Sequence, residues 1–393
     1  MHLTWACCKI FVARYFIKEK KKMEHIYYFI ILFVTIFLVS YSLIPKIRKI
    51  SLKFNLTDVP GVRSSHSNIT PSFGGVAFYI SYIIALFFIQ LFFENQVSLT
   101  LLVGISILFF TGLFDDIVNL SAKFKFFGQF LGVALLMSQP DFRIISMHGF
   151  MGIYEIPLVI SIAGSMFFLL GLINAFNLLD GIDGLSGITG IIVASFYSYM
   201  FYKLGYFYYL CISITTIASL LAFLRFNFSL RKKIFMGDTG SLTIGLVLGL
   251  LTLKLMTADA VDTALNFNPK QLPLFLVAVL YVPILDTCRV MIIRLLKGVS
   301  MFSPDRNHIH HIIVDFGLSH RKASSLIGFV NFCIGLFMFF VIINFNMVQS
   351  TLFLICIFIA GILLLFLMNK NKTALRLKVK LKASMLRMFF YLW

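Results

Sequence analysis

Charged residues are scarce in this sequence, and acids are the scarcest of them. Only 13% of the 393 residues are charged, with 16 acids against 34 Lys and Arg, while 60% are hydrophobic and the mean hydropathy is +0.94. A chain that presents so little charge to water is not a soluble globular domain. The composition predicts an all-α, polytopic integral membrane protein.

Cysteine is also sparse. The six cysteines lie mostly inside apolar runs, without the paired spacing of a disulfide framework or a zinc site, at positions 7, 8, 211, 288, 333 and 356. We expect them to pack as small core residues.

Long apolar runs supply the spans. A bilayer core requires about 20 apolar residues per helix. Eleven runs approach this length, at 25–44, 73–93, 97–114, 125–139, 156–173, 187–203, 206–224, 241–256, 271–290, 325–345 and 350–368. We therefore predict about eleven transmembrane helices in a membrane domain at 23–368, followed by a basic tail at 369–393.

The loops between these runs differ in charge on alternate sides. Together, 24 Lys and Arg lie in loops 45–72, 115–124, 174–186, 225–240 and 291–324, at Lys125 and Arg289, and in the tail. The opposite loops hold only Arg143, Lys203, Lys254 and Lys270. Because cytoplasmic loops retain positive residues, the first group and the tail are predicted to be cytoplasmic. The net charge of +18 then reflects orientation, and nucleic acid is not an expected partner.

The charge of the N-terminal segment conflicts with this topology. An odd number of spans places the N-terminus outside, which conflicts with four lysines between positions 18 and 22. Either the extension is cleaved or tolerated, or the count is off by one, or translation starts at Met23. We favour Met23, because these lysines break a charge bias that every other loop obeys, and residues 1–22 then carry no function.

On the outer side, 141–157 suits a short hairpin in which His148 is a solvated loop residue.

Nine of the 16 acids nevertheless lie on the predicted cytoplasmic side, at Asp58, Asp115, Asp116, Asp180, Asp183, Asp238, Asp286, Asp305 and Asp315. Acids contribute little to orientation, so their place on the basic face needs another cause. Mg²⁺ takes oxygen ligands, usually one or two protein carboxylates plus substrate phosphate oxygens. We therefore expect a Mg²⁺ cofactor, with Mn²⁺ as the alternative ion, and a polyanionic substrate.

The first acidic patch, Asp115-Asp116, ends the third apolar run and precedes Lys123 and Lys125. Adjacent acids cannot face the same way on a helix. One is expected to enter a site while the other orients it or a lysine. The competing explanation is helix termination with snorkelling lysines.

The second patch interrupts the chain directly after a long apolar run. Asn174 and Asn177 share a helix face, and Asp180 and Asp183 repeat the same spacing. Ionisable groups at the edge of a span are functional candidates by default. A helix cap needs only one such group, so a simple cap does not explain four.

The third patch, Gly237-Asp238-Thr239-Gly240-Ser241, opens the eighth run. The N–H groups of its first turn are expected to receive phosphate, while Asp238 holds a metal and Thr239 and Ser241 cap the helix. A cap without further function is the alternative.

Two more loops carry histidine and arginine. The last cytoplasmic loop contains Arg306, His308, His310 and His311, which suit anion recognition better than a transition metal because no cysteine is near. Upstream, Arg63 and His66 either bind substrate or only anchor their loop.

These ordered motifs resemble those of the polyprenyl-phosphate N-acetylhexosamine-1-phosphate transferases, glycosyltransferase family 4. They span roughly residues 45 to 325, in the order Asp-Xaa-Pro…Arg…His…Gly-Gly, Asp115-Asp116…Lys123-Xaa-Lys125-Phe, Asn174-Ala-Phe-Asn177-Leu-Leu-Asp180-Gly-Ile-Asp183-Gly-Leu, Gly-Asp238-Xaa-Gly-Ser, Pro283-Ile-Leu-Asp286-Thr and His308-Ile-His310-His311. The resemblance implies transfer of a hexosamine 1-phosphate from a UDP-N-acetylhexosamine to undecaprenyl phosphate, with release of UMP. It also implies an active site on the cytoplasmic face of the bacterial inner membrane and, as is common in relatives, a homodimer.

The resemblance also assigns roles. The acid matching Asp238 coordinates Mg²⁺, joined in some members by the asparagine matching Asn177. The acid matching Asp183 contacts uracil, and the aromatic residue matching Phe235 stacks on it. We predict catalytic residues at Asp115, Asp116, Lys123, Lys125, His308, His310 and His311, and substrate-binding residues at Asn174, Asp180, Asp183, Phe235, Arg306, Arg63 and His66.

Departures from the family pattern favour one branch. The segment Thr70-Pro-Ser-Phe-Gly-Gly replaces the Gly-Thr-Pro-Thr-Met-Gly-Gly of the branch that uses UDP-N-acetylmuramoyl-pentapeptide, and His-Ile-His-His replaces its consecutive histidines. The sequence looks like the N-acetylglucosamine-type branch, which begins O-antigen, teichoic acid or related polymers. The muramoyl-pentapeptide activity is the alternative within the family. A secondary transporter, which would place its acids near the bilayer midplane, is the alternative outside it.

Overall fold

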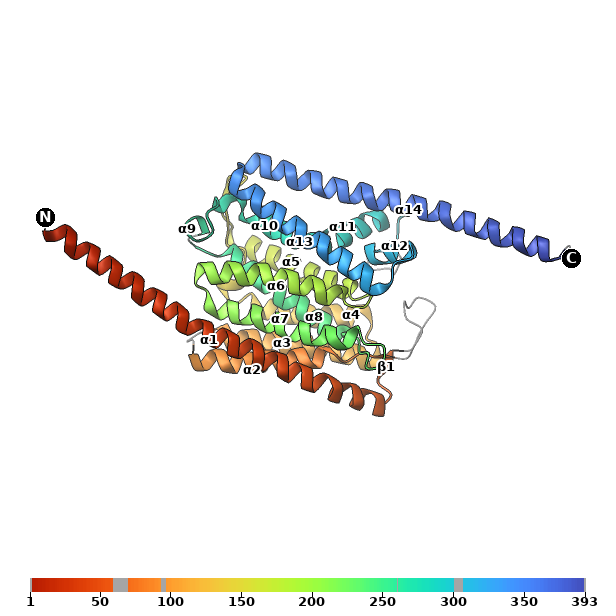
Figure 1. Ribbon diagram of the computed structural model, residues 1–393, viewed down its shortest axis with the longest axis horizontal. Coiled ribbons are helices and arrows are strands. Elements are labelled where there is room, and N and C mark those ends of the chain that lie inside the picture. Colours follow the sequence, from red (N-terminus) through yellow and green to blue (C-terminus); the bar gives the residue numbers. More distant parts are fainter. Residues whose placement is uncertain (1, 59–69, 93–96, 260, 300–306, 392–393) are drawn as a thin grey trace.

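The described part of the protein is a bundle of helices with two very short sheets (Figure 1). This computed structural model describes residues 2–58, 70–92, 97–259, 261–299 and 307–391, with their side chains from residue 26 to residue 370 except at 58 and 262. The predicted site residues Arg63, His66 and Arg306 lie outside the described residues.

The long helices follow the predicted apolar runs. They are α1 (His2–Lys53), α2 (Gly75–Phe92), α3 (Val97–Val118), α4 (Ala122–Leu136), α5 (Leu158–Leu179), α6 (Leu185–Leu204), α7 (Phe207–Asn227), α8 (Gly237–Met256), α10 (Leu272–Val279), α11 (Tyr281–Leu296), α13 (His320–Asn344) and α14 (Met347–Tyr391). Short elements connect them: β1 (Thr57–Asp58), β2 (Thr70–Pro71), η1 (Pro140–Phe142), β3 (Ser146–Phe150), β4 (Ile153–Glu155), α9 (Val261–Leu265), η2 (Pro269–Gln271) and α12 (Ile309–Asp315). Each of the eleven runs therefore forms helix.

Within the described chain, nine helices are long and apolar enough to cross a bilayer, and the segment through α10 and α11, bent by 71°, makes up to ten. The helix α4 has 15 residues, about 22 Å of length, which is short of a hydrocarbon core of about 30 Å. The all-α polytopic fold is confirmed, while the count of eleven spans stays a prediction.

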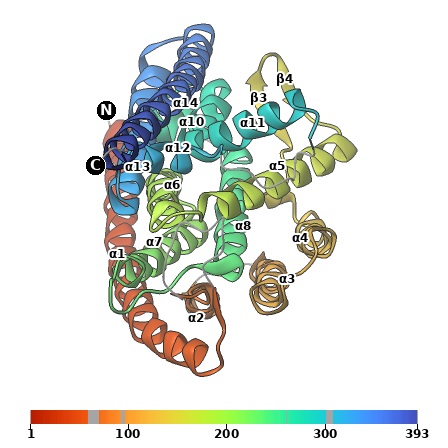
Figure 2. The ribbon, with the colours of Figure 1, turned by 90° about the vertical axis from the view of Figure 1, so that its right-hand side faces the viewer.

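The helix α8 lies at the centre of the bundle. In the apolar span of α8, 94% of the residues are buried inside the protein. The corresponding share for α14, on the periphery, is 11% (Figure 2). Its neighbours include α2, α3 and α5. Any polar group at the start of α8 is therefore surrounded by the ends of other helices.

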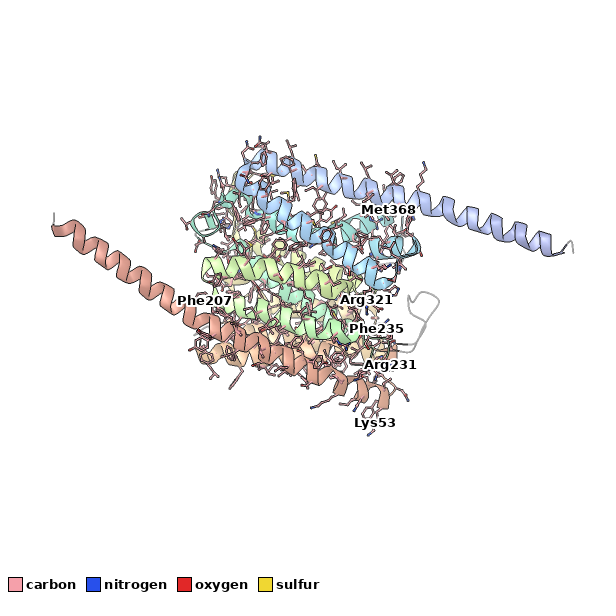
Figure 3. The ribbon with its side chains drawn as sticks, viewed as in Figure 1. Lys53, Phe207, Arg231, Phe235, Arg321 and Met368 are labelled. Carbon is pink, nitrogen blue, oxygen red and sulfur yellow. The ribbon has the colours of Figure 1, made fainter. Side chains whose placement is uncertain are left out.

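The predicted cytoplasmic loops gather at one end of this bundle. Figure 3 shows Lys53, Arg231, Phe235, Arg321 and Met368 at that end and Phe207 at the other. The shared end explains how motifs far apart in the sequence become neighbours.

The opposite end carries the predicted hairpin, in which β3 pairs antiparallel with β4. The expectation that His148 is solvated was wrong, because its Nε2 lies 2.9 Å from the carbonyl oxygen of Met256 in a partly buried position. Among the four cysteines whose side chains the structure describes, the expectation of a core position holds only for Cys211. Cys288, Cys333 and Cys356 are exposed, since the outer faces of these apolar helices turn away from the protein core.

The start of α2 packs directly on the start of α8. Gly74 N and Gly75 N donate to the carbonyl oxygens of Phe235 and Met236 at 2.9 and 3.0 Å. A Cβ atom at position 75 would lie 2.1 Å from the backbone nitrogen of Gly240. The contact therefore requires glycine, as the Gly-Gly pair in the sequence suggests.

We expect Gly75→Ala to lower the free energy of unfolding by roughly 1–3 kcal/mol, the usual cost of overpacking, and to lower the melting temperature of the purified protein. The matched control is Gly164→Ala in α5, where an added Cβ meets nothing within 4 Å. Equal melting temperatures for the two variants would contradict the close packing of α2 on α8.

Candidate active site

The N-terminus of α8 is capped by an acid from another helix. Asp116, at the end of α3, accepts hydrogen bonds from the backbone N–H groups of Asp238 and Thr239 at 2.9 and 3.0 Å. It also accepts one from the Thr239 hydroxyl at 2.5 Å. Gly237 has φ +72°, and a Cβ there would lie 2.6 Å from Asp116 Oδ2. The carboxylate of Asp116 thus fixes the turn that presents Asp238.

This arrangement corrects two expectations for the third patch. The first N–H groups of α8 were predicted to receive phosphate, but Asp116 occupies those of Asp238 and Thr239. Neither Thr239 nor Ser241 caps the helix, because Thr239 donates to Asp116 and Ser241 accepts from Asn177. A cap supplied by an acid 122 residues away has no local sequence signal.

Four predicted residues from four helices meet beside this turn. Lys125 Nζ of α4 lies 3.1 Å from Asp115 Oδ2 of α3 and 3.4 Å from Asn177 Oδ1 of α5, and it contacts Asp238 Oδ2 of α8. Asn177 Nδ2 donates to Asp238 Oδ1 at 2.7 Å. We call these four residues the Lys125 cluster. The side chains of Asp115, Lys125 and Asp238 are 17–24% exposed, so the cluster is partly buried but open to a ligand.

The cluster suits a hard cation. Three side-chain oxygens, from Asp115, Asn177 and Asp238, converge on one positively charged nitrogen. Oxygen donors of this kind match Mg²⁺. Among the described residues, no three His, Cys, Asp or Glu side chains are grouped so that they could hold an ion by themselves. A bound Mg²⁺ would therefore depend on Asp238 and Asn177 together with oxygens of a substrate.

A second charged group surrounds Asp183. Its Oδ2 atom lies 2.7 Å from Lys233 Nζ and 3.5 Å from His320 Nδ1, and its carbonyl accepts from Ser324. Burial alone would raise the pKa of the Asp183 carboxyl, but the hydrogen bonds and charges of His320 and Lys233 outweigh it and lower this pKa. Asp183 is thus a carboxylate at neutral pH.

An aromatic ring adjoins this carboxylate. Lys233 Nζ lies 5.1 Å from the centre of the Phe235 ring, within cation–π range. The segment that carries both residues is anchored by Arg48 of α1, which donates to the carbonyl oxygens of Lys233 and Arg231 at 3.1 and 3.3 Å. Phe235 and Asp183, which the resemblance predicts to contact the same uracil, therefore share Lys233 as a common neighbour.

The histidine segment, residues 308–311, is attached to α11 through Asp286. The Oδ2 atom of Asp286 lies 2.8 Å from His308 Nδ1. Its Oδ1 atom accepts hydrogen bonds from Ile309 N at 2.8 Å and from Arg289 Nη2 at 3.2 Å. Arg289 also donates to the carbonyl of Asn307. This acid positions the start of α12.

From there α12 reaches the second patch. A Cβ at Gly181 would lie 2.3 Å from His310 Nε2, so glycine is needed for this approach. The His310 ring packs against the rings of His308 and His311. Burial lowers the pKa of His310 to about 3, so this imidazole is neutral at pH 7.

The remaining predicted residues lie in different surroundings. Asp180 accepts from the Ser186 hydroxyl at 2.6 Å, and burial raises the pKa of this acid to about 7. Asn174 donates to Gln129 Oε1 of α4 and to the carbonyl of Leu170. Lys123 is exposed and makes no hydrogen bond or ion pair within the described part of the chain. The roles proposed for these three residues stay predictions.

Our sequence reasoning missed Lys233, His320 and Arg289. Lys233 lies in the basic run 231–233, which we interpreted only as a sign of orientation. His320 and Arg289 occur near a helix start and near the motif acid Asp286, but no spacing links either one to its partner. Only the fold brings them together.

We expect Asp286→Asn to increase backbone amide exchange across 308–315 by about tenfold or more, because the variant loses a charged acceptor for His308 and Arg289. Mass spectrometry of deuterated peptides measures this. Asp259→Asn, an exposed acid at the other end of α8, is the matched control. Unchanged exchange in 308–315 would show that Asp286 does not hold the segment.

Comparison with known proteins adds independent evidence. The sequence pattern of "Glycosyl transferase family 4" matches residues 98–256, which include the whole Lys125 cluster and Asp183. A probable undecaprenyl-phosphate N-acetylglucosaminyl 1-phosphate transferase of Bacillus subtilis is 31% identical over 357 residues, covering 89% of this chain and 92% of that protein.

Two further relatives have similar names. An undecaprenyl-phosphate alpha-N-acetylglucosaminyl 1-phosphate transferase of Yersinia pestis is 30% identical over 75% of this chain and 79% of its own. A decaprenyl-phosphate N-acetylglucosaminephosphotransferase of Mycolicibacterium smegmatis is 30% identical over 75% and 77%. With its motifs, its membrane fold and these relatives in agreement, the chain belongs to glycosyl transferase family 4.

Proposed function

We propose that this protein transfers N-acetylglucosamine 1-phosphate from UDP-N-acetylglucosamine to undecaprenyl phosphate, releasing UMP and starting a lipid-linked cell-envelope glycan. The observation that carries the proposal is the meeting of Asp115, Lys125, Asn177 and Asp238 at one end of the bundle. The names of the relatives from Bacillus and Yersinia support the sugar and the lipid. They also favour this donor over a muramoyl-pentapeptide.

Mg²⁺ is the proposed cofactor, with Mn²⁺ as the alternative. Asp238 and Asn177 would hold it, and when bound it neutralises charge on the diphosphate of the donor. Lys125 lies among the same oxygens and supplies a second positive charge to the reacting phosphates. Asp116 acts through the backbone of α8, so its role is to position Asp238.

The nucleotide is proposed to bind at Asp183 and Phe235. Both contacts that hold the Asp183 carboxylate use Oδ2, which leaves Oδ1 to accept from the N–H of uracil. The ring of Phe235 offers a stacking surface. The histidine segment, close to Gly181 of the same patch, is placed to contact the sugar and diphosphate.

The transfer itself requires little proton chemistry. An oxygen of the lipid phosphate attacks the β-phosphorus of the donor, and the bond from that phosphorus to the bridging oxygen breaks, so UMP leaves with the bridging oxygen. A phosphomonoester has a second pKa near 6, so the acceptor is mostly dianionic at pH 7 and a base is helpful rather than essential. Positioning and charge neutralisation then carry the rate.

A covalent route through an acidic residue is the rival scheme. Asp115 and Asp238 are the acids of the Lys125 cluster that could serve as nucleophile. In that route, labelled UMP exchanges into the UDP-sugar without any lipid acceptor. Direct attack predicts no such exchange.

Orientation and assembly complete the proposal. The basic loops and the site share one end of the bundle (Figure 3). That end is proposed to face the cytoplasm from the bacterial inner membrane. A homodimer is the proposed assembly.

Asp238→Ala is expected to lower kcat at least about 100-fold and to remove the response to added Mg²⁺, because it deletes the acid on which the cluster converges. The measurement is UMP release by the purified protein in detergent across a Mg²⁺ titration, with EDTA-treated wild type for comparison. Near-normal turnover in this variant would remove the metal assignment.

Lys233→Met is expected to raise KM for UDP-N-acetylglucosamine about tenfold with little change in kcat, since it loosens the carboxylate that faces the base. Asp183→Ala should act in the same direction. Lys232→Met, an exposed neighbour on the same loop, is the matched control. If Lys233→Met and Lys232→Met have the same KM, Asp183 and Phe235 do not form the uracil site.

A further inference from the structure

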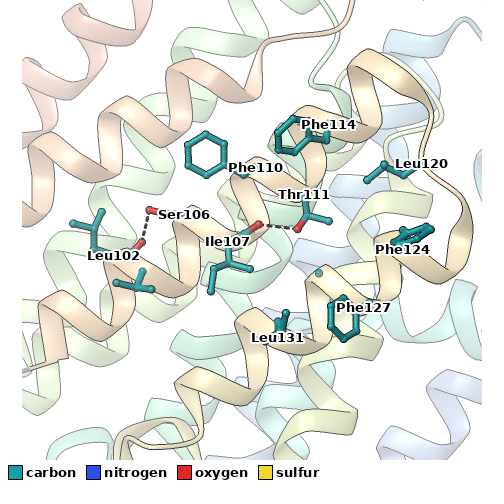
Figure 4. Close-up of a pocket in the computed structure, with 12 residues that line it drawn as sticks. Leu102, Ser106, Ile107, Phe110, Thr111, Phe114, Leu120, Phe124, Phe127 and Leu131 are labelled. Atoms are coloured by element: carbon teal, nitrogen blue, oxygen red, sulfur yellow. Dashed lines mark hydrogen bonds between the residues drawn. The ribbon is translucent and has the colours of Figure 1, made fainter.

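The described surface between α3 and α4 has the chemistry of a protein face that contacts lipid tails. A pocket of about 610 Å³ lies along this seam, and none of its twelve lining residues is charged (Figure 4). The hydroxyls of Ser106 and Thr111 donate to carbonyl oxygens of α3 at 2.7 Å, so neither requires water. Charged side chains on an outer face are therefore expected only where a helix leaves the hydrocarbon.

The helix α1 leaves it at the end of the bundle that holds the candidate site. Residues 26–45 carry no charged side chain. As a helix they extend about 30 Å, which is the thickness of a hydrocarbon core. From Lys46 to Lys53 the same helix continues for about 12 Å. These last two turns therefore lie at the level of the lipid headgroups.

One side of these two turns carries three lysines. Lys46, Lys49 and Lys53 follow the i, i+3, i+7 spacing of a single helix face, and Ile50 lies among them. All three lysines are exposed, and none makes a hydrogen bond or an ion pair within the described part of the chain. Ile50 is 56% exposed. We call these four residues the lysine face.

The surroundings of the lysine face contain no compensating acid in the neighbouring sequence. Segments 42–56 and 225–235, which Arg48 joins through hydrogen bonds, together hold eight Lys and Arg and no Asp or Glu. Exposed apolar side chains occur among these cations, with Phe54 65% and Leu230 100% exposed. Segments that bind at a membrane surface combine these features, because the apolar side chains enter the acyl boundary while the cations reach phosphate.

The position of the lysine face favours a lipid partner over a soluble acidic protein. Ile31 and Leu38, further back on the same side of α1, are 52% and 57% exposed. The lysine face is thus continuous with the apolar surface that α1 turns away from the protein core. A phospholipid whose tails cover Ile31 and Leu38 would place its phosphate beside Lys46 and Lys49.

The opposite side of the same two turns is connected to the candidate site. Ser51 is buried there, and Arg48 donates to the carbonyl oxygens of Lys233 and Arg231 at 3.1 and 3.3 Å. Lys233 in turn lies 2.7 Å from Asp183 Oδ2. The position of the end of α1 therefore affects the position of the loop that holds Asp183.

We propose that the lysine face binds the headgroups of anionic phospholipids in the adjacent leaflet, and that the bound lipid steadies the loop of Lys233 and Phe235 through Arg48. Arg48 is then a positioning residue, which acts on the loop and not on a substrate. The effect on the loop rests on the proposed function, because Asp183 and Phe235 form the proposed uracil site. Lipid binding itself does not depend on that function.

Lipid binding is tested on the purified full-length protein. Native mass spectrometry in detergent measures how much dioleoylphosphatidylglycerol the protein retains during a titration. We expect the triple variant Lys46→Gln, Lys49→Gln and Lys53→Gln to bind this lipid at least about tenfold more weakly, because it removes three cations at headgroup level.

The matched control removes the same charge from three other helices. It combines the exposed lysines at or next to the ends of α11, α13 and the apolar part of α14, as Lys297→Gln, Lys322→Gln and Lys370→Gln. Equal affinity of the two triple variants for phosphatidylglycerol would overturn the lysine face as a lipid site. Displacement of the lipid from wild type by excess inorganic phosphate would also overturn it, since the site would then bind a small anion.

The effect on the loop is tested in lipid nanodiscs. We expect phosphatidylglycerol, added to phosphatidylcholine discs, to lower KM for UDP-N-acetylglucosamine about fivefold in wild type and in the control variant. The lysine-face variant should show no such response. A wild-type KM that is the same in both discs would overturn the coupling through Arg48. An equal rise of KM in pure phosphatidylcholine discs would overturn it as well, because the lysines would then attract the donor directly.

Failure of the proposed function has a different signature. If wild type does not turn over UDP-N-acetylglucosamine in either disc, the proposed function fails. The binding titration then still decides whether the lysine face holds an anionic phospholipid.

Discussion

The contact between Asp116 and the start of α8 sets the position of the other groups in the site. The first N–H groups of a helix have no partner within the helix, and α8 begins in contact with α2 and α3. Asp116 satisfies two of these groups across the α3–α8 interface. Close packing supports the same interface, since a Cβ at Gly112 of α3 would lie 2.6 Å from the carbonyl oxygen of Asp238. Asp238, the proposed metal ligand, is therefore positioned by backbone packing.

The charges around this point form two groups with different balances. In the Lys125 cluster, two carboxylates and one ammonium leave a formal excess of one negative charge, which favours an added cation. Around Asp183, Lys233 compensates the acid and His320 adds a further donor. One group is therefore suited to gaining a metal with a diphosphate, and the other to holding a neutral base through hydrogen bonds. This separation is what the proposed UDP-sugar donor requires, because that donor is polyanionic in its middle and uncharged at its nucleobase.

Helix periodicity and apolar run length predicted the features of the protein that depend on neighbouring residues in the sequence. Helix periodicity implied that Asp115 and Asp116 point in different directions, and in the structure one contacts Lys125 while the other contacts α8. Apolar run length located every long helix. The capping of α8 could not be predicted, because its acceptor lies on another helix. Nor could the pairing of Lys233 with Asp183, which are 50 residues apart, or the role of Gly181 beneath His310.

The short helix α4 shows how a membrane enzyme joins a water-soluble donor to a lipid acceptor. Its first turn carries Lys123 and Lys125, and the residues that follow are apolar aromatics facing the seam with α3. Because α4 has 15 residues, the lysines of its first turn and the apolar rings that follow lie within about 22 Å of one another. The same helix therefore presents cations to the site and apolar side chains to its surroundings, which is the combination that the proposed transfer from a water-soluble donor to a lipid acceptor requires.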